Sequence, residues 1–253
     1  MRWRAASDWR RSLRMPDQST SLAEAAGETD ANFAVMTVCT MNICRSPAMQ
    51  YILERDMAPL VARFGITANV SSAGIQALVG APSCDISLAM VGQADRAETA
   101  RLFTLDPSNR PDLILGAARS HVSAAIGFDP KLRSITFTLL QACRLADWIV
   151  NDGPLEMGIR KLHGEVIDPD RTQPLTLTPA LPAEVGRRLV WLVSEMDAAR
   201  GLPPLPLQMP EPHHVDDIPD PHILGYNLHR MSADLILDAM ATFNRAVDRV
   251  LSA

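Results

Sequence analysis

The chain has few cysteines, no long apolar run and no excess of positive charge. Four cysteines in 253 residues are too few for the disulfide framework typical of small secreted proteins, and they favour reactive thiols instead. No apolar run reaches the length of a transmembrane helix, and the first residues lack the apolar core of a secretory signal. The net charge of −5 indicates neither nucleic-acid binding nor a general attraction to membranes. We therefore expect a cytoplasmic protein with no nucleic-acid and no membrane partner.

Residues 38–48 carry the most informative pattern in the chain, and they read Val-Cys-Thr-Met-Asn-Ile-Cys-Arg-Ser-Pro-Ala. The apolar run Phe33–Val38 is typical of a strand that is buried on both faces. Ser46 and Pro47 stand where the N-cap and the first residue of a helix are expected. Apolar residues then recur at three- and four-residue intervals up to Gly65, which is a common helix end. The pattern predicts a strand, a loop and a helix over residues 47–64.

The loop Cys39–Arg45 is thus held between a strand and a helix N-terminus, so its backbone N–H groups can converge on one anion. The same field and the neighbouring Arg45 favour the thiolate form of Cys39, which makes this residue a nucleophile. Arg45 offers a planar fork that holds two phosphate oxygens at once. The Ser46 hydroxyl can donate a hydrogen bond to the sulfur when it leaves as a thiolate. Because a thiolate alone expels an alkoxide poorly, this chemistry also requires a general acid.

The segment Val38–Ala48 resembles the phosphate loop of the low-molecular-weight protein tyrosine phosphatases. Further segments resemble parts of that family in the family's order, and they are Val70–Gly74, Pro111–Leu115 with Arg119–His121, Arg133–Leu145 and Ile218–Pro221. The resemblance covers about residues 33–147 and 214–251. Such an ordered set is far more specific than the loop motif alone.

The resemblance implies a phosphomonoester hydrolase that acts through a phosphocysteine intermediate, with no cofactor and no metal. It implies that the phosphate is bound by the loop residues Thr40, Met41, Asn42, Ile43, Cys44, Arg45 and Ser46. Asn42 and Ser72 resemble the residues that support the left-handed bend of the loop, a conformation that asparagine tolerates well. The expected substrate is a phosphorylated protein or a small aryl phosphate. The sequence leaves the oligomeric state open.

Three aspartates near the C-terminal end of the chain are candidates for the general acid. Asp220 is held extended by the two prolines of Ile-Pro-Asp-Pro, directly before a predicted helix. Asp216 and Asp217 are nearby rivals. We favour Asp220 because it alone directly precedes a proline, as the family's acid does. Together with Cys39 and Arg45 it forms the predicted catalytic group.

Three positions depart from the family pattern. Met41 occupies a place where the family usually has glycine, whereas Leu78 and His222 stand where tryptophan and tyrosine are common walls for the substrate ring. Their replacement weakens the case for phosphotyrosine in particular. Two other functions therefore stay open. One is arsenate reductase of the same fold, and the other is a catalytically weak module that binds phosphate or phosphoproteins.

The remaining thiols, histidines and arginines give weaker signals. The resemblance implies a protective disulfide between Cys44 and Cys39, and the alternative for Cys44 is a small buried residue. We expect Cys84 and Cys143 to be core or surface thiols. Side chains of the types that bind zinc are also found at His213, His214, Asp216, Asp217 and His222. Their spacing does not support a metal site, and we expect a solvated loop there. Arg119, His121 and Arg133 could approach the substrate, but we favour roles on helix surfaces for them.

Strands and helices alternate along the chain, which predicts a three-layer α/β sandwich with a central parallel sheet of about four strands and helices on both faces. The predicted strands are 33–38, 67–72, 111–116 and 133–136. The predicted helices are 47–64, 86–103, 119–127, 138–147, 184–200 and 224–250. Residues 1–31 read as a disordered extension, and 32–253 as the phosphatase-like domain with an insertion at about 148–213. Within the insertion, the proline-rich run 201–212 predicts a linker.

Overall fold

The central sheet has four parallel strands in the order β2-β1-β3-β4. They are β1 (Asn32–Cys39), β2 (Thr67–Gly74), β3 (Leu113–Gly116) and β4 (Thr136–Thr138). The structure is a computed structural model that describes residues 32–96, 98–106, 110–165, 178–203, 214–222 and 225–253. The predicted parallel sheet is confirmed. The prediction of disorder for residues 1–31 and most of the predicted linker 201–212 lie outside the described residues.

Helices cover both faces of the sheet, because alternate residues of a strand point to opposite sides. Val35, Leu113 and Leu115 face one side, and the helices packed there are α2 (Arg45–Phe64), α5 (Leu139–Asn151), α7 (Arg188–Ala198) and α8 (Tyr226–Ser252). Val38 and Ile114 face the other side, where α4 (Arg119–Phe128) and the 3-10 helix η2 (Pro130–Ile135) pack. The three-layer architecture predicted from the sequence is therefore the observed one.

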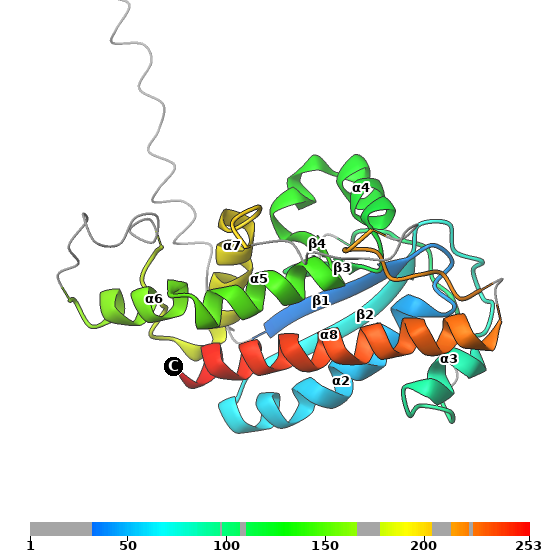
Figure 1. Ribbon diagram of the computed structural model, residues 1–253, viewed down its shortest axis with the longest axis horizontal. Coiled ribbons are helices and arrows are strands. Elements are labelled where there is room, and N and C mark those ends of the chain that lie inside the picture. The colour runs from blue at the N-terminus through cyan, green and yellow to red at the C-terminus, as the bar shows by residue number, and fades with distance from the viewer. Residues whose placement is uncertain (1–31, 97, 107–109, 166–177, 204–213, 223–224) are drawn as a thin grey trace, which may run out of the picture. The chain divides into compact units, whose positions relative to one another are not determined.

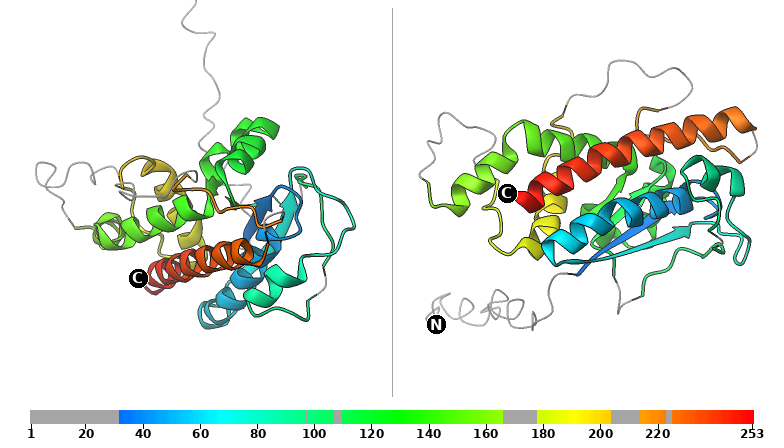
Figure 2. Two further views of the ribbon diagram at one scale, coloured as in Figure 1. Left: turned by 45° about the vertical axis from the view of Figure 1, so that its right-hand side comes forward. Right: turned by 90° about the horizontal axis from the view of Figure 1, so that it is seen from below.

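Helix α8 packs against helix α2. In Figures 1 and 2, α8 runs beside α2 along one face of the sheet, and the two helices are in contact. The segment before α8 follows the carboxyl end of the sheet, where the N–H of Ile218 donates to the carbonyl oxygen of Ala117 at 2.8 Å. Residues more than 170 positions apart along the chain, such as Arg45 and Ile218, thereby meet at the end of β1.

The predicted helix over 86–103 is wrong. The structure has only the short helix α3 (Asp85–Met90), after which Gly92 adopts a left-handed φ of 78°. The backbone beyond it bonds to other segments instead of continuing the helix, with Phe103 N–H donating to the Gly74 carbonyl oxygen at 2.8 Å. The predicted strand 133–136 is also displaced, to Thr136–Thr138, because residues 130–135 form η2, capped by the carboxylate of Asp129.

The described part of the insertion packs onto the main core. It contains α6 (Pro154–Leu162), the 3-10 turn η4 (Val185–Arg187) and α7. Leu189, Leu192 and Met196 of α7 are buried in the same hydrophobic cluster as the sheet, so the helix predicted over 184–200 contributes to the core. Within the ranges that the structure describes, none of the helices combines the length and hydropathy needed to cross a bilayer.

Candidate active site

The loop between β1 and α2 directs its carbonyl oxygens away from its own centre. Three of them accept hydrogen bonds from N–H groups outside the loop, namely Cys39 from Ile75 (3.0 Å), Thr40 from Gln76 (2.8 Å) and Ile43 from Cys84 (2.8 Å). These bonds hold the loop backbone in place directly before the N-terminus of α2. The N-terminus of α2 adds its dipole at the same place. This arrangement suits an anion such as phosphate.

Cys39 lies at the carboxyl end of β1 with its side chain held in the loop. Its sulfur accepts hydrogen bonds from the Ser46 hydroxyl at 3.0 Å and from the backbone N–H of Asn42 at 3.3 Å. The residue is only 3% exposed. Two hydrogen-bond donors are thus aimed at one buried sulfur at the carboxyl end of β1.

Ser46 is not the N-cap that the sequence pattern predicts. Helix α2 already begins at Arg45 with Cys44 as its N-cap residue, and no side chain caps it. The Ser46 hydroxyl is instead directed at Cys39, and it also accepts a hydrogen bond from the Asn42 amide at 3.0 Å. The prediction that this hydroxyl donates to the sulfur agrees with its position. The sequence pattern predicted the start of the helix to within one or two residues. It did not predict that the Ser46 hydroxyl bonds to Cys39 and leaves the helix end uncapped.

Asn42 supports the bend of the loop from inside the protein. Its φ is 58°, the one left-handed φ of a non-glycine residue among the described residues. Its side-chain amide donates to the hydroxyls of Ser46 at 3.0 Å and Ser72 at 2.8 Å, and its side-chain oxygen accepts from the N–H of Arg101 at 2.8 Å. Every hydrogen-bonding end of this buried side chain is therefore used. The geometry agrees with the supporting role expected for Asn42 and Ser72.

Arg45 links the loop to the segment before α8. Its guanidinium donates to the carbonyl oxygen of Ile218 at 3.0 Å and forms an ion pair with Asp220. A longer hydrogen bond, of 3.4 Å, reaches the Thr40 hydroxyl. Arg45 is 5% exposed, whereas the Asp220 side chain is 50% exposed. The buried arginine thus holds the more accessible aspartate at the mouth of the loop.

The two rival aspartates are occupied elsewhere. Asp216 forms an ion pair with Arg144 of α5. Asp217 accepts a hydrogen bond from the N–H of Arg119 at 2.8 Å, which places its charge at the N-terminus of α4. Of the three candidates, only Asp220 borders the cavity described below. The structure therefore brings together the three predicted catalytic residues, Cys39, Arg45 and Asp220.

A cavity of about 380 Å³ opens over the loop. Its lining consists of Cys39, Thr40, Met41, Ile43, Cys44, Arg45, Asp220 and His222. Met41 is thus part of the wall, and His222 lies where the sequence places a wall residue. Leu78, the other predicted wall residue, is absent from this lining and is 57% exposed. The structure therefore does not bring Leu78 to the cavity, and the expected wall role of Leu78 is not supported.

His121 lies in the interior, and the expected role on a helix surface is wrong. The residue is 2% exposed, and its Nε2 lies 3.0 Å from the Thr40 hydroxyl. Burial, followed by the charge of Arg45, lowers the pKa of His121 to about 4. A neutral imidazole therefore adjoins the loop at physiological pH. Arg119 and Arg133 do lie on the surface, where they pair with Asp217 and Asp197.

We predict that His121 makes the fold sensitive to acid. The ordinary pKa of histidine is 6.5, so the folded state binds fewer protons than the unfolded state, and stability present above pH 6.5 is lost as the pH falls toward 4. A shift of this size is worth roughly 2 to 3 kcal/mol by pH 4.5. Urea unfolding of wild type and His121→Gln at pH 7 and pH 4.5 measures it. An equal loss of stability in both proteins would contradict the assignment.

Gly74 lies against the backbone of the loop, a contact that the sequence patterns did not predict. A β-carbon at this position would lie 2.6 Å from the carbonyl oxygen of Thr40, 2.7 Å from the backbone nitrogen of Asn42 and 2.8 Å from the carbonyl carbon of Met41. All three contacts are backbone atoms of the phosphate loop. The end of β2 therefore supports the loop from beneath, and only glycine allows this approach. Its place after a strand marked a turn but not this contact.

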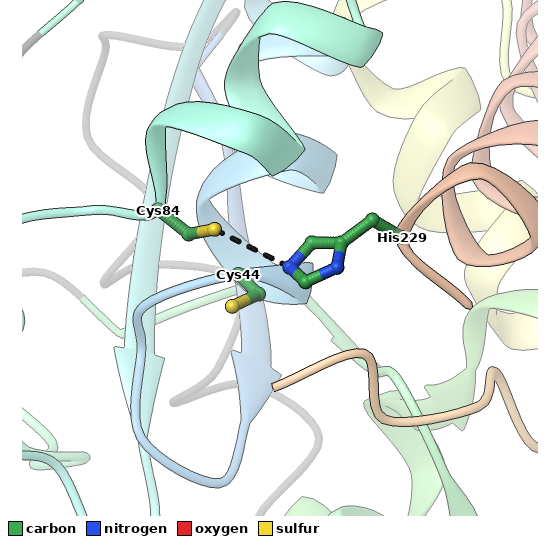
Figure 3. A group of neighbouring side chains, drawn as sticks. All are labelled: Cys44, Cys84 and His229. Carbon is green, nitrogen blue, oxygen red and sulfur yellow. Dashed lines mark hydrogen bonds between the residues drawn. The ribbon is translucent and has the colours of Figure 1, made fainter. Parts of the chain in front are cut away.

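A second group of reactive side chains adjoins the loop. Figure 3 shows Cys84 and His229 turned toward each other, with Cys44 close to both. The Cys84 sulfur lies 3.5 Å from Nε2 of His229, and Cys44 lies 3.9 Å from Nδ1 of His222. The hydrogen bond with Cys44 is the largest of the influences that hold the pKa of Cys84 well below its ordinary value. Cys84 is thus more than the simple core or surface thiol expected from the sequence.

Residues 34–168 match the family model described as low molecular weight phosphotyrosine protein phosphatase. The chain is 32% identical over 104 residues to the low molecular weight protein-tyrosine-phosphatase Wzb of Salmonella typhi, covering 40% of this chain and 64% of that protein. It is 31% identical over 107 residues to the probable phosphatase AmsI of Erwinia amylovora, covering 41% and 68%. The chain thus aligns with about two thirds of the length of these relatives.

Among solved structures, Vibrio vulnificus Wzb in complex with benzylphosphonate is similar to this chain with a TM-score of 0.48 and 18% identity, covering 84% of this chain and 97% of that one.

A putative low molecular weight protein-tyrosine-phosphatase of Klebsiella pneumoniae is 35% identical in sequence over 106 residues, which cover 40% of this chain and 67% of that protein. Because the family model spans more than half of the sequence, including the whole loop, the chain belongs to the low molecular weight phosphotyrosine protein phosphatase family.

Proposed function

We propose that this protein hydrolyses phosphomonoesters through a phosphocysteine intermediate. The observation that carries the proposal is the meeting of Cys39, Arg45 and Asp220 at one cavity over a loop shaped for an anion. Membership of the phosphatase family supports the same reaction. Each of the three residues has a chemical type that phosphoryl transfer requires, namely a nucleophile, a bidentate cation and a proton donor.

The reaction has two steps. In the first, the Cys39 thiolate attacks phosphorus in line while protonated Asp220 gives its proton to the leaving oxygen. A sulfur–phosphorus bond forms and the ester oxygen–phosphorus bond breaks. In the second, Asp220, now a carboxylate, takes a proton from water as the water oxygen attacks phosphorus. The thiolate leaves and accepts the hydrogen bond from Ser46, as it does at 3.0 Å in the structure. Phosphate and the original enzyme result.

Arg45 connects substrate binding to the state of Asp220. Its guanidinium is shared between the carbonyl oxygen of Ile218, the carboxylate of Asp220 and the Thr40 hydroxyl. A bound phosphate dianion competes for the same donors, since two of its oxygens match the guanidinium fork. We propose that substrate draws the guanidinium away from Asp220 and adds negative charge beside it. The Asp220 carboxyl is then released from its ion pair with Arg45 and can face the leaving oxygen in the first step.

The substrate class follows from the cavity walls. Met41, Ile43 and His222 border the phosphate site, and they offer apolar surface and one imidazole rather than a pair of large aromatic rings. We propose a phosphorylated protein or a small aryl phosphate as substrate. The curated relatives are named protein-tyrosine-phosphatases, which supports the first of these. A methionine wall adapts its shape to different leaving groups, so a broad specificity is expected.

We also propose a cytoplasmic location. All four cysteines are free in the structure, and two of them line the cavity. A thiolate nucleophile needs a reducing compartment to stay active. This supports the location expected from the sequence.

A leaving-group series tests the role of Asp220. In Asp220→Asn we expect hydrolysis of an alkyl phosphate to fall by about 10²- to 10⁴-fold. The fall is expected to be smaller for p-nitrophenyl phosphate, whose leaving phenolate needs little protonation. The measurements are kcat/KM for both substrates and the burst of nitrophenolate in the first turnover. Asp217→Asn is the matched control, because Asp217 lies in the same segment and pairs with Arg119.

Equal losses for both substrates would show that Asp220 does not act as an acid. The same assays separate the two alternative functions. A phosphate-binding module binds vanadate but releases no nitrophenolate, in a burst or afterwards. An arsenate reductase consumes a thiol reductant when arsenate is added, since its cysteine must pass the oxidised state to a second thiol. Either result without ester hydrolysis would overturn the proposed function.

A further inference from the structure

Cys44, Cys84 and His229 come from three separate elements and meet beside the phosphate loop. Cys44 is the N-cap residue of α2, Cys84 is the N-cap residue of α3, and His229 lies in the first turns of α8. Their two sulfurs and one ring nitrogen all lie within 4.8 Å of one another. Figure 3 shows the imidazole edge turned toward the Cys84 sulfur, with the Cys44 side chain below them in this view. Three potential ligands thus surround one point.

The imidazole of His229 is held in the tautomer that a metal requires. Its Nδ1 lies 3.1 Å from the carbonyl oxygen of Gly225. A carbonyl oxygen can only accept a hydrogen bond, so Nδ1 must carry the proton. The lone pair is then on Nε2, the atom that faces the Cys84 sulfur at 3.5 Å. Metal-binding histidines are typically oriented in this way, by a hydrogen bond from the second ring nitrogen.

The distance between these two atoms matches the geometry of zinc. A tetrahedral Zn²⁺ ion has Zn–S bonds of about 2.3 Å and Zn–N bonds of about 2.0 to 2.1 Å, which place the sulfur and nitrogen about 3.5 Å apart. The observed separation is 3.5 Å. Two thiolates and an imidazole are ligands for zinc and similar soft or borderline ions, and unsuitable for Mg²⁺ or Ca²⁺.

The exposure of the three side chains would shield a bound ion from bulk water and still let it enter the site. Cys44 is 5% and His229 7% exposed, whereas Cys84 is partly exposed. An ion could therefore enter from the Cys84 side and lose most of its water to the two buried ligands. His222 lies near Cys44 but outside the group of three. Three protein ligands leave a fourth position for water, a common arrangement around zinc.

We propose that Cys44, Cys84 and His229 bind one Zn²⁺ ion next to the active site. On binding, both sulfurs coordinate as thiolates and the protons that they carried pass to solvent. The ion fastens the start of α8, and so the end of the Asp220 segment, to the phosphate loop and α3. The site contains none of the catalytic residues Cys39, Arg45 and Asp220, although Cys44 also lines their cavity. Its existence does not depend on the proposed hydrolysis. It replaces the expectation of no metal and uses none of the loop residues 213–217.

Zinc titration of the purified, reduced, full-length protein tests the proposal. After removal of metal with a chelator, zinc is added in competition with a chromophoric chelator. We expect one tightly bound ion per chain. Cobalt, used as a probe in place of zinc, is expected to give a thiolate-to-metal charge-transfer band and the visible absorption of a tetrahedral site. Zinc is also expected to raise the midpoint of thermal unfolding, because it binds the folded state alone.

The variants assign the ion to its ligands. Cys84→Ser and His229→Gln are each expected to weaken zinc binding by at least about 100-fold and to abolish the zinc-dependent rise in the unfolding midpoint. Cys143→Ser is the matched control, since Cys143 is a half-buried thiol that is not one of the three proposed ligands. Circular dichroism of the metal-free variants checks their folding, and the cobalt spectrum of the wild type stands independently of it.

Four results would overturn the proposal. The first is no binding of zinc at micromolar concentration. The second is a cobalt spectrum without thiolate charge transfer. The third is loss of the bound ion in Cys39→Ser, because the ion would then lie on the nucleophile and not on the group of three. The fourth is retention of full affinity in both Cys84→Ser and His229→Gln, because the ion would then be held by other residues.

Discussion

Replacing Cys39 with serine is expected to lower turnover of p-nitrophenyl phosphate by on the order of 10⁴-fold or more, and to abolish the burst of nitrophenolate. A serine hydroxyl remains protonated at neutral pH, so it is a much weaker nucleophile than the thiolate. The replacement is nearly isosteric, and its oxygen can still accept from Ser46 and from the N–H of Asn42, which bond to the sulfur at 3.0 and 3.3 Å. The fold and the phosphate site are therefore expected to survive.

Measuring vanadate or phosphate binding to Cys39→Ser shows whether its activity is lost because the nucleophile is missing or because the phosphate site is damaged. Binding of the anion should persist, since Arg45 and the loop amides are unchanged. Cys143→Ser serves as the matched control and should keep wild-type turnover. If Cys39→Ser turned over at the wild-type rate, Cys39 would not be the nucleophile and the proposed mechanism would have to be abandoned.

Gly74→Ala is expected to impair activity by about 10²-fold or more, although Gly74 has no side chain and contributes none to the chemistry. The added β-carbon would come within 2.6 to 2.8 Å of backbone atoms of the loop, distances at which the atoms must move apart. A shift of about 1 Å in a catalytic group costs on the order of 10²-fold in rate. The overlap is also expected to destabilise the fold by about 1 to 3 kcal/mol.

Gly127→Ala is the matched control, because a β-carbon at Gly127 would meet no atom within 4 Å. Gly127 lies within helix α4, where alanine is the better helix former. The measurements are kcat/KM for p-nitrophenyl phosphate and urea unfolding of both variants. If Gly74→Ala retained wild-type turnover, the end of β2 would not be what positions the loop.

Local patterns predicted the parts of the site that are contiguous in the chain. The run from Cys39 to Pro47 specifies a strand, a loop and a helix, and the residue types alone indicate a nucleophile and an anion clamp. Asp220 was chosen by its place before a proline in a recognisable segment. These inferences agree with the structure because each rests on neighbouring residues, whose geometry is fixed by the backbone they share.

Contacts between distant segments could not be predicted in this way. His121 looked like a residue of a helix surface, yet it lies beside Thr40 at 3.0 Å because α4 packs against the end of the sheet. Leu78 aligned with a wall position, yet the chain turns it toward solvent. The predicted helix over 86–103 failed because its backbone bonds to β2 and the neighbouring loop. In each case another segment competed with the local preference and won.

The sequence by itself indicated the family and the parallel sheet, and it proposed Cys39, Arg45 and Asp220 as nucleophile, arginine and acid. Tertiary structure alone decided that Asp220 pairs with Arg45 while Asp216 and Asp217 are held by other arginines. It also decided that Gly74 supports the loop and that Cys84 and His229 meet Cys44. The physical reason is that residue type and spacing fix local backbone geometry and chemistry, whereas partners across the chain are chosen only when the elements pack.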